Sequence, residues 1–246
     1  MPIVTLRPRS GVELIDASFQ FLRENFATLF TAVVIAFIPV AVMGYVSAAN
    51  PGDSMLNLLA RITDWVFTSA GQAAAIIIVA KRYLGEDITP ADALRAVSRR
   101  LGTVLWVSFL YGFGIGIGLI LLIFPGIWVA VTYFAGMAAA MVEGTGASDS
   151  LERSKELTKG SRLRIAGIFG VSYLVYLIAA AFFGAIAGAI FGVTAGTLVG
   201  TLLLACIYPF IAVLATLLYF DLRIRREGLD LDLMLDAQPA GAPAAG

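Results

Sequence analysis

Long stretches without any charged residue alternate with short charged segments along this chain. The three longest charge-free stretches cover residues 25–52, 101–142 and 165–220. Roughly 20 consecutive apolar residues are enough for a helix to cross a bilayer, so the second and third stretches are each long enough to cross it twice. The pattern therefore predicts membrane-spanning helices, and the two longer stretches predict helical hairpins.

Glycine and proline indicate where these hairpins turn. Phe124, Pro125 and Gly126 lie near the middle of the second stretch, and residues 192–196 begin and end with glycine within the third. Together with a further span at 57–80, they predict an all-α, polytopic membrane helix bundle with six transmembrane helices. The helices are expected at residues 25–49, 57–80, 103–124, 127–142, 165–191 and 196–220.

Three charged segments are expected to form amphipathic helices on the cytoplasmic membrane surface. The first, at 10–26, starts with the capping box SGVE. The second, at 89–101, starts with a Thr-Pro pair that is typical of a helix N-terminus, and the third covers 148–159. Each precedes a hairpin, so the chain is interpreted as three units of one surface helix and one hairpin.

Two alanine-rich segments support an internal repeat and a single membrane domain at residues 1–236. AGQAAA at 70–75 ends the second span, and AGMAAA at 135–140 ends the fourth. Repeats of like topology are related by an axis along the membrane normal. The Pro-, Ala- and Gly-rich residues 237–246 are expected to form a disordered tail.

Composition and charge agree with a membrane protein. Hydrophobic residues make up 59% of the chain and charged residues 14%, with a mean hydropathy of +0.89. Of the 17 Lys and Arg residues, all except Arg61 fall on one side of the predicted spans. Positive residues favour the cytoplasmic side, so both termini are expected to be cytoplasmic. Trp128 is expected at the opposite, outer interface. The formal net charge of zero gives no indication of a nucleic-acid partner.

The stretch YGFGIGIGLI at 111–120 is expected to be a helix, because an open glycine loop is costly in lipid. Spacing by four gives two GxxxG pairs, Gly112 with Gly116 and Gly114 with Gly118, on nearly opposite helix faces. This helix is therefore expected to be approached closely from two sides. A second ladder that includes Gly184 and Gly188 also predicts close packing, with a water-lined path as the alternative.

Candidate chemistry is sparse. The chain has no histidine and one cysteine, Cys206, which removes histidine bases and histidine metal ligands, and no P-loop, G-x-S-x-G or HExxH motif is present. We therefore expect no catalytic site, metal or cofactor. An intramembrane enzyme remains an alternative only if acidic side chains converge in one cleft. They are Glu143, Asp149, Glu152 and Asp221.

Two sets of polar residues are candidate sites. Arg61 and Asp64, with Asn57 and Gln72, could line a polar pocket within the membrane and serve a small transporter or permease-like protein. The alternative is that Arg61 and Asp64 pair and extend to the outer interface. The second set could bind lipid head groups or a protein partner at the cytoplasmic face, although positive residues there also serve orientation. It comprises Arg95, Arg99, Arg153, Lys155, Lys159, Arg162 and Arg164.

Three segments carry a resemblance to a known family: LRPRSGVELIDASFQFLRENFATLF, EGTGASDSLERSKELTKGSRLRIAGI and YFDLRIRREGLDLDLML. They resemble the bacterial glycerophosphoryl diester phosphodiesterase membrane-domain family over nearly the whole chain. In that family the membrane region can stand alone or accompany a catalytic barrel that depends on histidines and acidic metal ligands. Here the barrel and the histidines are both absent, so the resemblance implies an inner-membrane module without that activity.

The sequence thus predicts a non-catalytic, multi-pass protein of the bacterial inner membrane. Its expected partners are membrane lipids, in particular anionic phospholipid, or a membrane or cytoplasmic protein. Small-residue faces serve contacts within one chain or between chains equally well, so a homo-oligomer is a further expectation.

Overall fold

The computed structural model describes residues 9–228, and within them every regular element is a helix. Five segments are long and apolar enough to cross a membrane. They are Gly11–Ala49, Ser54–Tyr83, Leu101–Leu121, Ile123–Val142 and Arg162–Glu227. The all-α fold is confirmed, and these helices are typical of a membrane protein. The tail expected at 237–246 lies outside the described residues.

The first hairpin consists of α1 (Gly11–Ala49) and α2 (Ser54–Tyr83). The Ser10 capping box is confirmed: its hydroxyl accepts from the backbone N–H of Glu13. However, α1 contains both the surface helix expected at 10–26 and the span expected at 25–49, so the prediction of two separate helices is wrong here. No glycine or proline interrupts residues 12–38, and the helix continues through both.

The second hairpin follows the short helix α3 (Pro90–Arg99), which is capped as expected by Thr89. It consists of α4 (Leu101–Leu121) and α5 (Ile123–Tyr133). The chain turns at the extended residue Leu122, not at residues 124–126 as expected. Pro125 instead lies in the first turn of α5, where its missing N–H costs no helical hydrogen bond.

The fourth expected span, 127–142, is broken near Phe134, between α5 and α6 (Gly136–Val142). The break exposes backbone groups that α7 (Ala147–Thr158) satisfies. The Ser154 hydroxyl donates to the Thr132 carbonyl at 2.9 Å and accepts from the Ala135 N–H at 3.1 Å. Because of these buried bonds, α7 is a packed part of the fold as well as a surface helix.

The third hairpin is α8 (Arg162–Glu227), whose helical course is interrupted at Gly192 (φ 75°, ψ 170°). Glycine pairs at equal distances from Gly192 face each other: a Cβ on Gly196 would lie 2.7 Å from Gly188 Cα, and one on Gly200 would lie 3.8 Å from Gly184 Cα. The expected hairpin and its glycine packing are therefore present, with the reversal at one residue.

The glycines of α4 pack on one side only. A Cβ on Gly118 would lie 2.7 Å from Gly126 Cα, and one on Gly114 would lie 3.2 Å from Val129 Cγ1. A Cβ on Gly112 or Gly116 would meet nothing within 4 Å. Close approach from two sides is therefore wrong for this chain: α5 covers one face, and the other is open.

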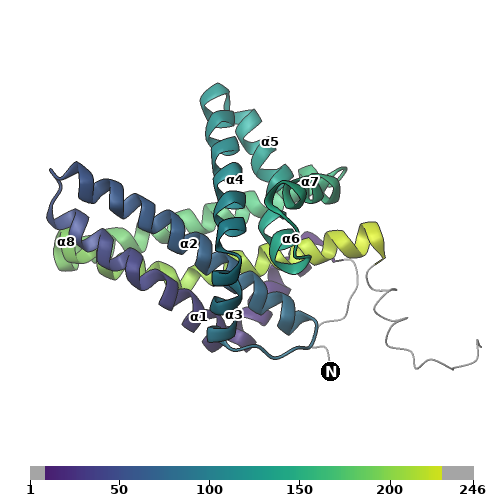
Figure 1. Ribbon diagram of the computed structural model, residues 1–246, viewed down its shortest axis with the longest axis horizontal. Coiled ribbons are helices and arrows are strands. Elements are labelled where there is room, and N and C mark those ends of the chain that lie inside the picture. The colour runs from purple at the N-terminus through teal and green to yellow at the C-terminus, as the bar shows by residue number, and fades with distance from the viewer. Residues whose placement is uncertain (1–8, 229–246) are drawn as a thin grey trace, which may run out of the picture.

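The three hairpins are not arranged as equivalent units (Figure 1). α1, α2 and the two limbs of α8 run together along the length of the molecule, whereas the α4–α5 hairpin projects from the side of this bundle. The two alanine-rich segments meet in the core, since residues 73–75 and 138–140 are at most 1% exposed and α2 contacts α6. Several side chains near the hairpin tip stay uncovered, with Ile120 86% and Phe124 78% exposed.

Candidate functional site

The basic residues expected to bind lipid fall into three groups in the structure. Arg153 and Arg164 form ion pairs within the fold, and Arg162 lies against an aromatic ring. Arg95 pairs with Asp92 at 3.2 Å on the exposed side of α3. Within residues 9–228 the remaining three show no ion pair and have exposed side chains. They are Arg99, Lys155 and Lys159.

Arg153 joins α7 to the end of α8. Its Nε lies 3.0 Å from Glu143 Oε2, and its Nη1 lies 2.5 Å from Glu227 Oε1. Partial burial raises the pKa of Glu227, but hydrogen bonds from Arg153 and Arg223 outweigh it and hold the pKa below its ordinary value. Both carboxylates depend on the positive charge of Arg153, and its guanidinium group is already engaged in these ion pairs. Arg153 is therefore a structural residue.

Arg164 takes part in a second, more buried network. Its Nη1 donates to Asp221 Oδ2 at 2.8 Å, and Arg225 Nε donates to the same oxygen at 2.9 Å. Asp221 is 2% exposed, so its charge is balanced by these two guanidinium groups in place of water.

The contact between Arg162 and Trp128 conflicts with their expected positions. The two were expected on opposite sides of the membrane, yet the Arg162 guanidinium carbon lies 4.9 Å from the centroid of the Trp128 ring. Trp128 and Arg162 therefore lie on the same side, so their expected placement on opposite sides is wrong. The α4–α5 hairpin leaves the bundle sideways (Figure 1), and α5 contacts α8.

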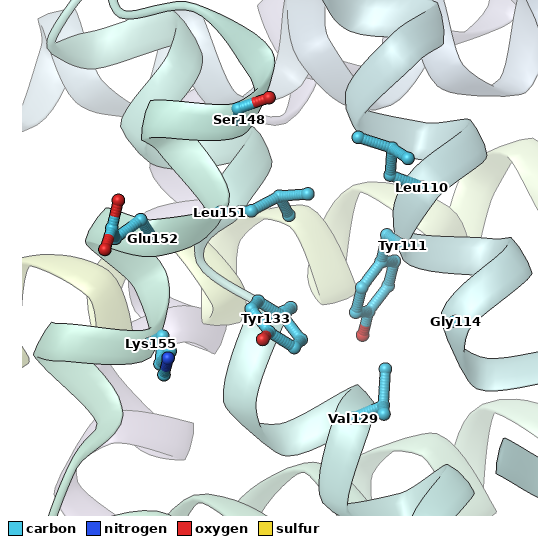
Figure 2. A pocket seen from close by; sticks show the side chains of 9 residues that line it. All are labelled: Leu110, Tyr111, Gly114, Val129, Tyr133, Ser148, Leu151, Glu152 and Lys155. Carbon is cyan, nitrogen blue, oxygen red and sulfur yellow. The ribbon is translucent and has the colours of Figure 1, made fainter.

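A cavity of about 390 Å³ lies between α4, α5 and α7 (Figure 2), and we call it the α7 pocket. Its inner wall is mainly apolar or aromatic, and its outer rim on α7 carries Ser148, Glu152 and Lys155. The lining residues are Leu110, Tyr111, Gly114, Val129, Tyr133, Ser148, Leu151, Glu152 and Lys155.

Local packing gives the α7 pocket its shape. Tyr111 reaches from α4 to α5 and donates to the Ala130 carbonyl at 3.1 Å. Gly114 lets α5 come close on the same face, because a Cβ there would lie 3.2 Å from Val129. On the opposite wall α7 is held by the buried Ser154, so both walls are fixed by hydrogen bonds or close packing.

The polar membrane site expected around α2 is only partly assembled. Asn57 accepts a hydrogen bond from Ser47 at 2.5 Å and donates to the Pro51 carbonyl at 3.2 Å, so its side chain ties the start of α2 to the end of α1 and the connecting loop. Among the described residues Arg61 forms no ion pair with Asp64. Only Asp64 and Gln72 of the four line a common cavity.

That cavity, of about 490 Å³, lies among α1, α2, α4 and both limbs of α8, and we call it the tyrosine cavity. Asp64 is the one charged residue in its lining, which also contains four tyrosines. The lining residues are Phe37, Val40, Asp64, Thr68, Gln72, Tyr111, Phe134, Phe169, Tyr173, Tyr176, Thr201, Leu204, Tyr208, Ile211 and Ala215.

The tyrosines were not among the candidate residues from the sequence. A usable signal existed, because Tyr173 and Tyr176 are spaced i,i+3 on one helix face within a charge-free span. Tyr111 and Tyr208 lie far away in the chain, and nothing local indicates that they join the same cavity. Only the packing of four helices brings them together.

The four acidic residues named for an enzyme do not share a cleft. Glu143 binds Arg153, Asp221 binds Arg164, and Glu152 lines the α7 pocket, while Asp149 lies beside Gly146 at the start of α7. Within residues 9–228 no group of three or more His, Cys, Asp and Glu side chains could hold a metal ion.

Comparison with protein-family models, curated proteins and solved structures finds no match to this chain.

Proposed function

We propose that this chain is a non-catalytic, multi-pass protein of the bacterial inner membrane that binds a membrane phospholipid in the α7 pocket. The observation that carries the proposal is the amphipathic lining of that pocket, which has an apolar inner wall and a charged rim. The resemblance to the membrane domain of glycerophosphoryl diester phosphodiesterases agrees with this proposal and supplies the bacterial location.

In the proposed topology α1, α2 and the two limbs of α8, which meet at Gly192, cross the membrane. Both termini, α3 and α7 are cytoplasmic, because the Lys and Arg residues gather there. The α4–α5 hairpin enters the bilayer beside the bundle, and its exposed tip residues Ile120 and Phe124 contact lipid.

The chemistry of the α7 pocket suits a phospholipid at the level of the head groups. Lys155 is exposed on the rim and supplies a positive charge for the lipid phosphate. Leu110, Val129 and Leu151 offer apolar surface for the beginning of an acyl chain. Because Glu152 stands on the same rim, an ammonium group of a zwitterionic head group would also find a partner.

Lys155 is a sharper target for mutation than the arginines of the same segment. Reversing Arg153 would place an acid beside Glu143 and Glu227 and disrupt the fold. Lys155 has no such role, so a change in lipid binding by a Lys155 variant reports on the pocket itself.

The test is native mass spectrometry of purified protein from nanodiscs that contain phosphatidylglycerol, phosphatidylethanolamine and phosphatidylcholine. We expect the wild type to retain one phospholipid, and Lys155→Glu and Ser148→Trp to lose it, because one reverses the rim charge and the other fills the opening. Arg23→Glu, a charge reversal at an exposed residue of α1, is the matched control and keeps the lipid.

The lipid retained by the wild type identifies the head group. Retention of phosphatidylglycerol indicates that Lys155 dominates, whereas phosphatidylethanolamine indicates that Glu152 contributes. Equal lipid retention by wild type, Lys155→Glu and Ser148→Trp would overturn the proposal. A stable second protein or second copy in place of lipid would favour the alternative, a partner-binding module.

A small transporter is the second candidate, and one observation favours it. The tyrosine cavity lies within the predicted spans and contains Asp64 and Gln72. Transport also requires access from both sides, so this candidate is tested by uptake into vesicles and not by binding.

A further inference from the structure

The tyrosine cavity has a carboxylate in its lining that comes from the membrane-spanning part of α2, and the Asp64 side chain that carries it is exposed at the surface of the helix bundle. Asp64 follows Ser54, the first residue of α2, by ten positions, which is about 15 Å along a helix at 1.5 Å per residue. A hydrocarbon core is about 30 Å thick, so Asp64 lies well away from either end of the span. An ionised group at such a depth is costly unless another charge compensates it.

Within the described residues the protein supplies little compensation. The one hydrogen bond to the Asp64 carboxylate comes from the Thr68 hydroxyl at 3.2 Å. The cavity lining contains no lysine or arginine, and Arg61, one turn earlier on the helix, does not pair with Asp64. The cavity therefore has an excess negative charge.

The walls around this charge are aromatic. Phe37 packs against Tyr208 with ring centroids 5.2 Å apart, and Tyr173 stacks on Tyr176 at 5.9 Å. Tyr176 and Tyr208 line the cavity together with Asp64, so the rings and the carboxylate face the same space. Aromatic faces attract cations, most strongly where water is excluded.

From this combination we infer that the tyrosine cavity binds a lipophilic, monovalent organic cation, such as a quaternary ammonium or phosphonium ion. Its positive centre lies near Asp64 and its apolar substituents lie against the tyrosine and phenylalanine rings. A volume of about 490 Å³ is within the range of small-molecule sites. Tyr173 is 52% exposed beside the cavity, which gives an amphiphilic cation a route of entry from the bilayer.

The same features reject other ligand classes. A phosphate or carboxylate would meet Asp64 without any basic side chain in the lining, so anionic lipids are disfavoured. A small metal cation is usually held by several charged or carbonyl oxygen ligands, whereas the lining has a single carboxylate and seven aromatic residues. The inference does not depend on lipid binding in the α7 pocket, since Tyr111 is the one residue common to both linings.

The test measures equilibrium binding of radiolabelled tetraphenylphosphonium to purified protein in nanodiscs, with empty nanodiscs for the background. Tetraphenylborate has the same shape and the opposite charge, and serves as the ligand control. We expect saturable binding of the phosphonium and none of the borate. Asp64→Asn should weaken phosphonium binding at least tenfold, because it removes the charge and keeps the side-chain size.

Further variants distinguish the contribution of the aromatic rings to phosphonium binding from a loss of the folded structure. Tyr176→Phe keeps the ring and should bind within about threefold of the wild type, whereas Tyr176→Leu should lose tenfold or more. Glu152→Gln and Lys155→Glu, both in the α7 pocket, should leave phosphonium binding unchanged. Unaltered binding by folded Asp64→Asn, or equal binding of the borate, would overturn the inference.

Discussion

Asp221 on α8 accepts a 2.7 Å hydrogen bond from the backbone N–H of Arg9, which lies 212 positions earlier and just before α1. The Arg9 carbonyl in turn accepts from the guanidinium groups of Arg164 and Arg225 at 2.5 and 2.6 Å. One buried carboxylate thus connects the start of α1 with both ends of α8.

Removal of the Asp221 carboxylate should be among the most destabilising single changes. Asp221→Ala leaves Arg164 and Arg225 without their shared acceptor, and breaking a buried pair typically costs about 3–5 kcal/mol. Asp221→Asn keeps an acceptor for Arg9 and should cost less. The measurement is the free energy of unfolding in detergent, followed by tryptophan fluorescence.

The matched control for Asp221 is Asp87→Asn. Asp87 pairs with Arg82 at 2.8 Å, but its side chain is 91% exposed, and exposed pairs contribute about 0–1 kcal/mol. Equal losses in the two variants would contradict the role given to Asp221.

Gly192 should not tolerate a side chain. Its φ of 75° and ψ of 170° lie in a region that is nearly exclusive to glycine, and strain of this kind costs about 1–3 kcal/mol. Gly192→Ala should lower the free energy of unfolding by that amount. Gly184→Ala serves as the control, because a Cβ there meets nothing within 4 Å. If both variants melt like the wild type, the reversal is not confined to Gly192.

Alanine substitutions on α4 should distinguish its covered face from its open face. A Cβ on Gly118 would lie 2.7 Å from backbone atoms of Gly126, and overpacking of this kind costs about 1–3 kcal/mol. Gly112→Ala meets open space and should be neutral or stabilising by up to about 1 kcal/mol, because alanine favours helix. Thermal unfolding of the two variants measures this difference. Similar destabilisation by both would indicate that α4 is closely packed on both faces.

The attachment of α7 to α8 should weaken in acid through Glu227. The folded state lowers the pKa of Glu227 below its ordinary value of 4.5, so its stabilising contribution is present above pH 4.5 and is lost as the pH falls through the lowered pKa. We expect Glu227→Gln to be about 1–2 kcal/mol less stable than the wild type at pH 7.

The pH dependence of that difference is the measurement. Between pH 7 and pH 3 the stabilities of the wild type and Glu227→Gln should approach each other as the pH falls, because protonation of Glu227 removes its charge. A difference that stays constant across this range would show that Glu227 does not act through its charge.

Local signals in the sequence were sufficient to predict several structural elements. The Ser10 box and the Thr89 cap depend on neighbouring residues and were confirmed. The α8 hairpin followed from a charge-free run too long for one crossing, with Gly192 as a residue able to adopt a positive φ. These features require no knowledge of what packs against them.

Features that depend on distant partners could not be predicted. The turn at Leu122 is set by the approach of Gly118 to Gly126, and the role of Arg153 depends on Glu227 from the far end of the chain. Sequence spacing could not show that Asp64 faces tyrosines from three other segments. The same limit applies to Arg61, whose proximity to Asp64 in the sequence did not produce an ion pair.

The contact between Arg9 and Asp221 also has a consequence for synthesis of the chain. Translation at about 5–20 residues per second would deliver Asp221 roughly 10–40 s after Arg9, so the beginning of α1 must wait in the membrane without its acceptor. Until then, the start of α1 has only its packing against α2 and α3 to hold it in place. The last residues of α8 to be synthesised therefore complete the attachment of the first residues of α1.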